Sequence, residues 1–304
     1  MKFWLGVTDN RWFEYVSTRG LSEVNFWQPS ARPPFSHLPE GTWFFFKLKR
    51  PKNHIAGGGR FVSYTNLSLS MAWDIFGEQN GAANLSEFAA LIADNAHDRP
   101  DFTREIGCTV LTDVFYLQEP LWVENDDFFP KAVMRGKAYD TGEALGESLW
   151  DRLNQVMGQS GLNDYIHEEG ARYGTEFLQR GRLGQGAFRS LVLDAYSRRC
   201  ALTGESTQPV LEAAHIRPYA DSGSHHTTNG LLLRSDFHKL FDVGLVTVEP
   251  DYRIRISPQI RDQWFNGKAY YRLDGQPLSV LPKRAQDQPD RDALRWHNEN
   301  RFLA

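Results

Sequence analysis

The sequence predicts an α+β protein in two parts, a mostly β N-terminal half and a C-terminal half built around a strand–strand–helix unit. Three observations lead to this prediction. Short runs of β-branched and aromatic residues fill the first half, a helical pattern begins at Glu143, and a compact, motif-rich stretch begins near Gly184. With 304 residues, 41% of them hydrophobic, the chain is long enough to form two cores.

The N-terminal half contains four runs that are typical of strands, each bounded by Gly, Pro, Asn or Asp. The four runs are residues 2–7, 42–48, 59–64 and 108–117. Helices are expected at residues 69–76 and 85–96, the second with Asn84 as its N-cap and Glu87 at capping-box spacing. Strands with few helices predict a small barrel or a curved sheet with flanking helices.

A helical stretch follows and is expected to connect the two domains. Its apolar residues recur at steps of four, four and three, which places them on one helix face: Leu145, Leu149, Leu153 and Val156. A second helical stretch is expected to run to Leu178. The predicted organisation is therefore a first domain at residues 1–142, a helical linker at 143–181 and a second domain at 182–304.

Composition excludes several classes of protein. The two cysteines, Cys108 and Cys200, are too few for a disulfide scaffold or a four-cysteine zinc site. The longest apolar run, Phe88–Ala93, is far shorter than the ~18 residues of a membrane helix. The N-terminus lacks the apolar stretch of a signal peptide. We therefore expect a cytoplasmic protein without a membrane partner. The net charge of −4 shows no overall excess of Lys and Arg.

The residues best suited to chemistry lie in three short stretches of the last third, CALTG at 200–204, EAAHIRPY at 212–219 and NGLLLRSDFHKLFD at 229–242. His215 ends a short apolar strand, and Asn229 opens a second strand fourteen residues later. The two strands and the helix that follows them form a compact unit.

The helix is expected to start after Ser235 as its N-cap and to end before Gly244 in a left-handed conformation. Its apolar residues would face the core, and His238 and Asp242, four positions apart, would share the opposite face. Hydrolysis of a phosphodiester needs a base that activates water and a cation that stabilises the developing charge. An imidazole on a strand end, facing an imidazole and a carboxylate on a helix, can provide both. The alternative is that each histidine is a hydrogen-bonded structural residue.

Taken in order, these stretches resemble the HNH nucleases of the ββα-metal fold, and the resemblance extends over residues 182–304. It implies that His215 is the general base, that Asn229 holds and orients its loop, and that His238 is a ligand of one divalent cation such as Mg²⁺ or Mn²⁺. Arg234 is a candidate for positioning a phosphate.

The sequence departs from this family at two points. Many members carry Asp or His directly before the general base as a second metal ligand, whereas Ala214 stands here and cannot bind metal. The candidates to replace that ligand are Asp236, Asp242, His225 and His226. The paired zinc cysteines of many relatives are also missing, so Cys200 is expected to be a buried packing residue.

The N-terminal half resembles a second family. FWLGVTD at 3–9, WFFFKLK at 43–49 and IAGGGRF at 55–61 are similar to the EVE-like and SRA-like branch of the PUA superfamily. That branch occurs fused to HNH modules in modification-dependent restriction endonucleases. The resemblance implies a PUA-like β-barrel that flips a modified cytosine, 5-methylcytosine or 5-hydroxymethylcytosine, out of double-stranded DNA into an aromatic or apolar pocket.

A flipped base needs stacking partners that offset the cost of unstacking it, about a few kcal/mol. Asn25 is the candidate partner for the base edge. The candidates for stacking are Trp27, Pro29, Tyr64, Trp73 and Trp122. For each of the aromatic residues, the alternative is a place in the core. The candidate phosphate contacts are Lys47, Lys49 and Arg60, which lie in a stretch without Asp or Glu between Gly41 and Trp73.

Together these features predict a prokaryotic DNA endonuclease that cleaves DNA with modified cytosine and requires one divalent cation per nuclease site. A double-strand break needs two such sites, so a homodimer is expected. Two alternatives remain open. The reader domain could recognise phosphorothioate or another modification, or the protein could be a DNA-binding sensor whose HNH fold is inactive at Ala214.

Overall fold

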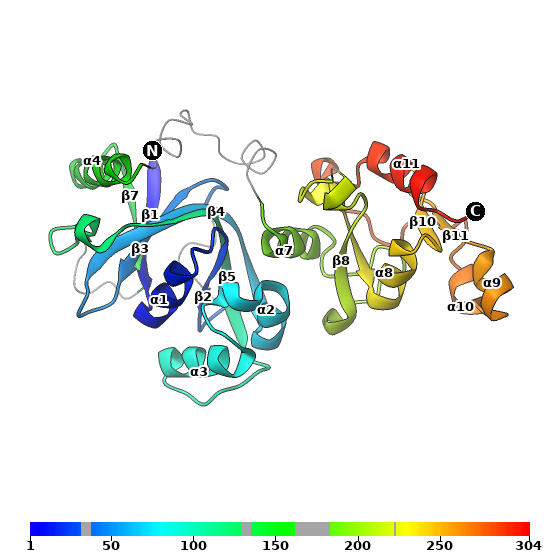
Figure 1. The fold of residues 1–304 in the computed structure, drawn as a ribbon, viewed down its shortest axis with the longest axis horizontal. Coiled ribbons are helices and arrows are strands. Elements are labelled where there is room, and N and C mark those ends of the chain that lie inside the picture. The colour runs from blue at the N-terminus through cyan, green and yellow to red at the C-terminus, as the bar shows by residue number, and fades with distance from the viewer. Residues whose placement is uncertain (32–37, 129–134, 162–182, 222) are drawn as a thin grey trace. The chain divides into compact units, whose positions relative to one another are not determined.

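The chain is divided into two units, unit 1 (Met1–Ala187) and unit 2 (Phe188–Ala304). The structure, a computed structural model, describes residues 1–31, 38–128, 135–161, 183–221 and 223–304. The class is α+β, as predicted (Figure 1). The expected second helical stretch up to Leu178 lies outside the described residues. Within the described part of the chain, no helix has both the length and the apolar character needed to cross a membrane.

Unit 1 is built on one seven-stranded mixed sheet. Its elements are β1 (Lys2–Thr8), α1 (Asn10–Thr18), β2 (Val24–Gln28), β3 (Trp43–Leu48), β4 (His54–Ser68), α2 (Leu69–Phe76), the 3₁₀ helix η1 (Gly77–Asn80), α3 (Leu85–Ala96), β5 (Glu105–Tyr116), η2 (Glu119–Leu121), β6 (Val123–Glu124), β7 (Gly136–Asp140) and α4 (Ala144–Gln159). The strand order is β2-β5-β4-β3-β1-β7, and β6 pairs with β4. β1 and β3 run parallel, and the other pairs are antiparallel.

The aromatic run of β3 is buried on both faces of this sheet. Trp43 and Phe45 belong to a core cluster that includes residues of α4. Phe46 points to the other face, where its ring meets Trp12 of α1 at 5.4 Å between centroids. Because side chains alternate along a strand, a continuous apolar run is the pattern of a strand covered on both sides.

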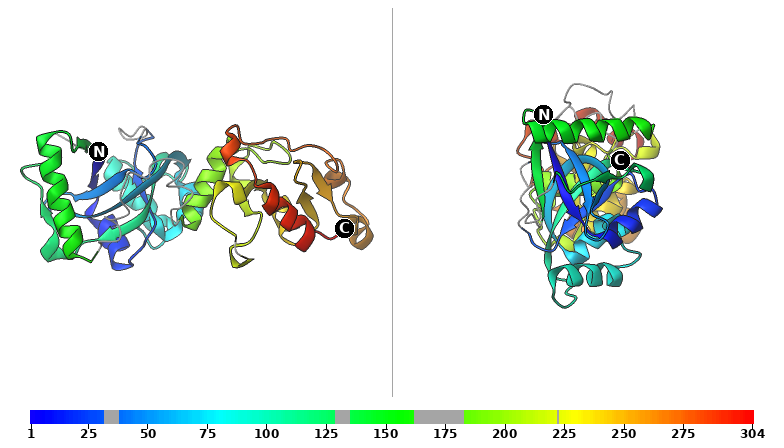
Figure 2. Two further views of the ribbon diagram at one scale, coloured as in Figure 1. Left: turned by 90° about the horizontal axis from the view of Figure 1, so that it is seen from above. Right: turned by 90° about the vertical axis from the view of Figure 1, so that its left-hand side faces the viewer.

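Helix α4 packs against the sheet of unit 1, where Figure 2 shows it as a green coil beside the strands. Leu149, Leu153 and Val156 are buried as predicted, whereas Leu145 in the first turn is 40% exposed. The helix is thus part of unit 1, and the boundary between the units falls after Ala187.

Most of the expected elements of unit 1 are present. The two predicted helices match α2 and α3, and the Asn84 side chain caps α3 by accepting a hydrogen bond from the Glu87 amide at 2.9 Å. Strand β4 is longer than the predicted run 59–64, because it begins at His54 and ends at Ser68, and Gly57 allows a close contact with β5. A Cβ at Gly57 would lie 2.4 Å from the carbonyl oxygen of Phe115. Helix α1 and strand β2 were not predicted.

Asn80 ties strand β2 to the α2–η1 turn and was not predicted to have this role. Its Nδ2 donates to the carbonyls of Ala72 and Gly77 at 3.0 and 2.8 Å, and its Oδ1 accepts from Nδ2 of Asn25 at 2.8 Å. Its carbonyl accepts from the indole N–H of Trp27 at 2.9 Å. Both asparagines are fully buried.

Unit 2 contains two short hairpins and the helices around them. Its elements are the C-terminal part of α7 (Gln185–Ala195), η3 (Gln208–Val210), β8 (Leu211–His215), η4 (Tyr219–Asp221), η5 (Thr227–Asn229), β9 (Gly230–Arg234), α8 (Ser235–Asp242), β10 (Val246–Val248), β11 (Ile254–Ile256), α9 (Gln259–Trp264), α10 (Lys268–Tyr271), η6 (Ala285–Asp287) and α11 (Arg291–Asn300). β8 pairs with β9, and β10 pairs with β11, both antiparallel.

Helix α8 is held in place from its buried side. Phe237 and Phe241 are 1% exposed, and the Phe241 ring stacks on the buried His297 of α11 at 3.8 Å. The helix begins one residue earlier than predicted. Arg234, with extended backbone, is the N-cap and Ser235 is the first helical residue. Gly244 is left-handed as predicted, at φ 77°.

Replacement of Asn80 by Ala should lower the free energy of unfolding of unit 1 by about 3 kcal/mol. The change removes three side-chain hydrogen bonds and leaves buried polar groups without partners. Urea unfolding followed by tryptophan fluorescence measures the effect, with the exposed Asn300→Ala as control. A loss below about 1 kcal/mol would show that Asn80 does not have this role.

Candidate active site

Strands β8 and β9 and helix α8 form the strand–strand–helix unit that the sequence predicts. His215, the last residue of β8, lies opposite Gly230, the first residue of β9. Leu231–Leu233 are buried, and α8 follows β9 directly, beside β8 (Figure 1). His215, Asn229 and His238 therefore come from one small, rigid part of unit 2.

His215 is held on two sides. Its ring stacks on Phe188 with 3.9 Å between centroids, and its Nε2 lies 3.0 Å from Nδ1 of His225. Burial, followed by the positive charges of His225, His238 and Arg189, lowers the pKa of His215 to about 4. The imidazole is therefore neutral at pH 7 and is able to accept a proton. The sequence predicts no role for Phe188, and it indicates His225 only as a candidate metal ligand.

Asn229 clamps the loop that follows the His215 strand. Its Oδ1 accepts from the Arg217 amide at 2.9 Å, and its Nδ2 donates to the carbonyls of Arg217 and Ser224 at 2.9 and 2.8 Å. Its own carbonyl accepts from the Ile216 amide. These bonds restrain the backbone directly after His215.

Two carboxylates approach His238 from different elements. Oε2 of Glu212, on β8, lies 2.6 Å from Nδ1, and Oδ2 of Asp242 lies 3.4 Å from Nε2. Glu212 was not predicted as a site residue. Its position two residues before Ala214 was the available signal, because such residues share one face of a strand.

Asp236 is turned toward Arg234. The two side chains form a two-point ion pair, Nε to Oδ1 and Nη2 to Oδ2, both at 2.7 Å. The hydrogen bond from Arg234 holds the pKa of Asp236 below its ordinary value. Of the two carboxylates predicted as metal ligands, Asp242 thus lies beside His238. The other, Asp236, is paired with Arg234, the residue predicted to contact a phosphate.

The donor set around His238 suits a hard or borderline divalent cation. In the described residues, no three His, Cys, Asp or Glu side chains form a ready-made metal cluster. His238 with Glu212 or with Asp242 supplies one nitrogen and one carboxylate. Mg²⁺ usually keeps several waters and takes only one or two protein carboxylates, and Mn²⁺ accepts mixed nitrogen and oxygen ligands. Such an ion therefore fits the residues present.

Of the predicted base-reading residues, two lie in the network around Asn80. Asn25 is fully buried, and its Oδ1 has no hydrogen-bond partner among the described residues. Trp27 is 7% exposed and packs edge-on against Phe88 at 6.2 Å. The Trp73 ring also packs against Phe88, with 6.3 Å between centroids, and is half-buried. Trp27 is thus a core residue, whereas Trp73 keeps a partly open surface.

Pro29 and Tyr64 lie around Gly107, apart from that network. A Cβ at Gly107 would be 2.5 Å from the Tyr64 hydroxyl and 3.0 Å from the carbonyl oxygen of Ser30. Tyr64 is half-buried, and burial raises the pKa of its hydroxyl. Arg104 donates to the Pro29 carbonyl at 3.3 Å. Two of the predicted stacking residues, Pro29 and Tyr64, therefore lie near Gly107.

Trp122 lies elsewhere in unit 1. Its indole N–H donates to the Leu117 carbonyl at 2.9 Å, and its ring packs edge-on against Phe13 at 6.1 Å. Lys52 lies over the ring at 5.4 Å. The structure does not bring Trp122 into the groups formed by the other predicted stacking residues.

The basic residues predicted for DNA contact make contacts within unit 1. Lys47 is 7% exposed, and burial, followed by the charge of Arg50, lowers its pKa. The Arg60 guanidinium lies 3.7 Å over the Trp43 ring and donates to the Gly41 carbonyl.

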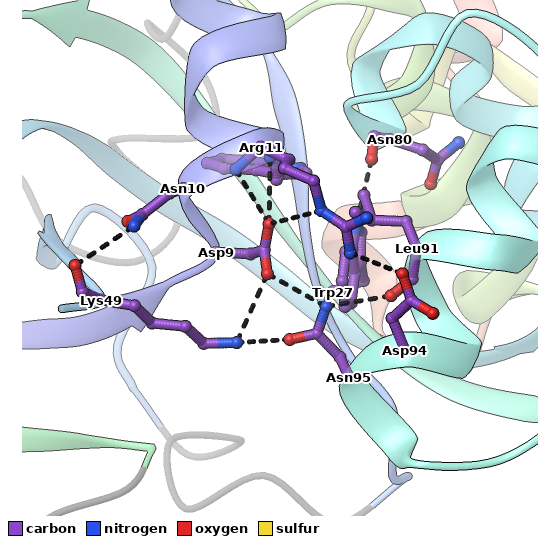
Figure 3. A network of polar contacts seen from close by, with 10 residues as sticks. Asp9, Asn10, Arg11, Trp27, Lys49, Asn80, Leu91, Asp94 and Asn95 are labelled. Carbon is purple, nitrogen blue, oxygen red and sulfur yellow. Dashed lines mark hydrogen bonds and ion pairs between the residues drawn. The ribbon is translucent and has the colours of Figure 1, made fainter. Parts of the chain in front are cut away.

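Lys49 belongs to a polar network centred on Asp9 (Figure 3). The Asp9 carboxylate caps α1 through the amides of Arg11 and Trp12, and its Oδ2 accepts from Asn95 at 3.0 Å and from Lys49 at 3.4 Å. Burial raises the pKa of Asp9, but the hydrogen bond from Asn95 and the charge of Lys49 outweigh it and lower the pKa overall. The network joins the ends of β1, β3 and α3.

Comparison with known proteins identifies part of unit 2. Residues 200–249 match the family model described as HNH endonuclease. No curated protein matches the sequence. The resemblance of the C-terminal half to HNH nucleases is therefore confirmed over these fifty residues.

Solved structures give more distant likenesses. ASCH, a PUA-like domain, from Zymomonas mobilis covers 47% of this chain and 93% of its own, with 12% identity and a TM-score of 0.34. A mutant of the same protein covers 49% and 97%, with 11% identity and a TM-score of 0.35. The modification-dependent TagI restriction endonuclease covers 91% of this chain and 75% of its own, with 13% identity and a TM-score of 0.28. At TM-scores below 0.5, these likenesses decide neither fold nor activity.

The neutral state of His215 can be tested by a histidine NMR titration. With its pKa lowered to about 4, the imidazole should stay uncharged down to about pH 5, where an ordinary histidine of pKa ~6.5 is mostly protonated. The urea-unfolded protein provides the reference titration. A midpoint near 6.5 in the folded protein would contradict the lowered pKa of His215.

Proposed function

We propose that this DNA endonuclease, whose residues 200–249 match the HNH endonuclease family, cleaves double-stranded DNA that carries modified cytosine. Unit 2 would hydrolyse the phosphodiester, and a PUA-superfamily reader at residues 1–142 would bind the modified base. The observation that carries the proposal is the pairing of a neutral imidazole, His215, with a second histidine, His238, that two carboxylates approach.

The proposed mechanism begins with His215. Its unprotonated nitrogen accepts a proton from water as the water oxygen attacks phosphorus. Asn229 fixes the loop after the base, so the imidazole stays aligned during the proton transfer. His238 and one neighbouring carboxylate would hold a divalent cation, and such an ion would supply stabilisation of the negative charge that develops at the phosphate.

The reading of cytosine is supported by a polar group in the core of unit 1. The Asn25 amide oxygen is buried without a hydrogen-bond partner in the described residues, and such a group costs about 1–3 kcal/mol. Cytosine carries an amino group at C4 that donates to an oxygen of this kind, and it would reach the fully buried Asn25 only after the packing around β2 opens. Trp73, which is partly exposed beside Phe88, remains the candidate for stacking on a base that Asn25 contacts, whereas the register places Tyr64 on the opposite face of the sheet from Asn25.

The remaining parts of the proposal concern assembly and location. Each chain contains a single HNH match, and a double-strand break requires two cuts, so a homodimer on DNA is proposed. The proposed location is the prokaryotic cytoplasm, where foreign modified DNA would be met.

Replacement of His215 by Ala should reduce cleavage at least ~100-fold, because a general base contributes that much or more. Binding to the same DNA should be unchanged, since unit 1 is untouched. Initial cleavage rates and a gel-shift assay measure the two quantities. The control is His97→Asn, which removes an exposed imidazole and keeps a residue that tolerates the left-handed backbone at this position. Equal cleavage by the two variants would overturn the assignment of the base.

The substrate can be identified by cleavage of matched DNA duplexes. The duplexes carry unmodified cytosine, 5-methylcytosine, 5-hydroxymethylcytosine or phosphorothioate, each with Mg²⁺ and with Mn²⁺. Cleavage of the two modified cytosines at least tenfold faster than unmodified DNA is expected. Preference for phosphorothioate would indicate a different reader, and equal rates on all duplexes would refute modification-dependent reading. Absence of cleavage of every duplex with both ions would refute the proposed nuclease function and favour the alternative of a DNA-binding sensor.

A further inference from the structure

The two carboxylates that approach His238 contact different nitrogens of its ring. Glu212 lies at Nδ1 and Asp242 at Nε2. A single ion binds only one nitrogen of an imidazole. An ion at Nδ1 would therefore be shared with Glu212, and an ion at Nε2 with Asp242.

The location of each pair relative to the catalytic base favours Nδ1. Glu212 belongs to β8, the strand that ends in His215, so an ion at Nδ1 is held jointly by β8 and α8. An ion at Nε2 would have its protein ligands from α8 alone, because Asp242 lies one turn along the same helix. The water that His215 activates and the cation must both contact the same phosphate, so they must lie close together. Only an ion at Nδ1, shared with Glu212, has a ligand from the strand that ends in His215.

Glu212 is also placed to replace the ligand that is missing at Ala214. The two residues are separated by one position on β8, so their side chains leave the same face of the strand. Ala214 is fully buried and offers no donor atom, whereas the longer Glu212 side chain reaches His238. Two of the other candidates already have partners, because Asp236 is paired with Arg234 and His225 is bonded to His215.

We infer that Glu212 is the second protein ligand of the catalytic cation, which it shares with Nδ1 of His238. Asp242 then has a different role. It accepts a hydrogen bond from the Nε2–H group and fixes the orientation of the ring, as carboxylates commonly do for metal-bound histidines. Water completes the coordination. This inference rests on the proposed metal-dependent nuclease function and assigns the position that Ala214 leaves open.

The first test is Mn²⁺ binding to the full chain without DNA, measured by the loss of the free-ion EPR signal. Glu212→Gln keeps the shape of the side chain and should weaken Mn²⁺ binding at least ~10-fold. The control Glu299→Gln removes an exposed carboxylate from α11 and should leave binding unchanged. Unchanged binding in Glu212→Gln would overturn the inference.

A second test separates a ligand from an orienting residue. With Co²⁺, Glu212→Cys should produce a near-ultraviolet thiolate-to-cobalt charge-transfer band, and Asp242→Cys should produce none. The wild type provides the baseline, because Cys108 and Cys200 are both buried. The absence of a band in Glu212→Cys, or a band in Asp242→Cys alone, would overturn the inference. Both tests measure metal binding without DNA. A negative result would therefore overturn the role of Glu212 but not the proposed recognition of modified cytosine or the role of His215, which the cleavage experiments test.

Discussion

The geometry of the active site depends on how helix α8 packs against the β8–β9 hairpin. Phe237 and Phe241 bury one side of the helix, and the leucines of β9 bury the sheet face beneath it. This packing leaves His238 facing β8, and the pairing of β8 with β9 places His215 beside the start of the second strand. The hydrophobic contacts thus hold His215, the predicted base, and His238, the predicted metal ligand, in one small unit, although none of the apolar residues takes part in the proposed chemistry.

The surplus of aromatic residues is explained mainly by the core of unit 1. Trp12, Trp27 and Trp43 are buried, and β3 contributes aromatic rings to both faces of its sheet. A central strand covered on both sides needs large apolar side chains at every position, which accounts for a run of four aromatics. Only a few of the predicted base-stacking residues keep open surface, with Trp73 and Tyr64 as the main examples.

Several basic residues that look available for DNA in the sequence are paired or buried in the structure. A stretch of basic residues suggests a phosphate-binding surface, yet Lys49 pairs with Asp9 and Lys47 is buried. In unit 2, Arg234 and Asp236 neutralise each other. A count of Lys and Arg along the chain could not reveal that Lys49 is paired, because Asp9 lies 40 positions away in the sequence.

The sequence by itself determined the strand–strand–helix unit, its three central residues His215, Asn229 and His238, and the bounds of α2 and α3. These are local features, since caps, apolar periodicity and motif spacing act over a few residues. Only the tertiary structure showed that Glu212 contacts His238 and that Asn80 contacts Asn25, because these partners lie 26 and 55 positions apart in the sequence. Contacts of this kind arise when separate segments pack together, and no pattern within one segment encodes them.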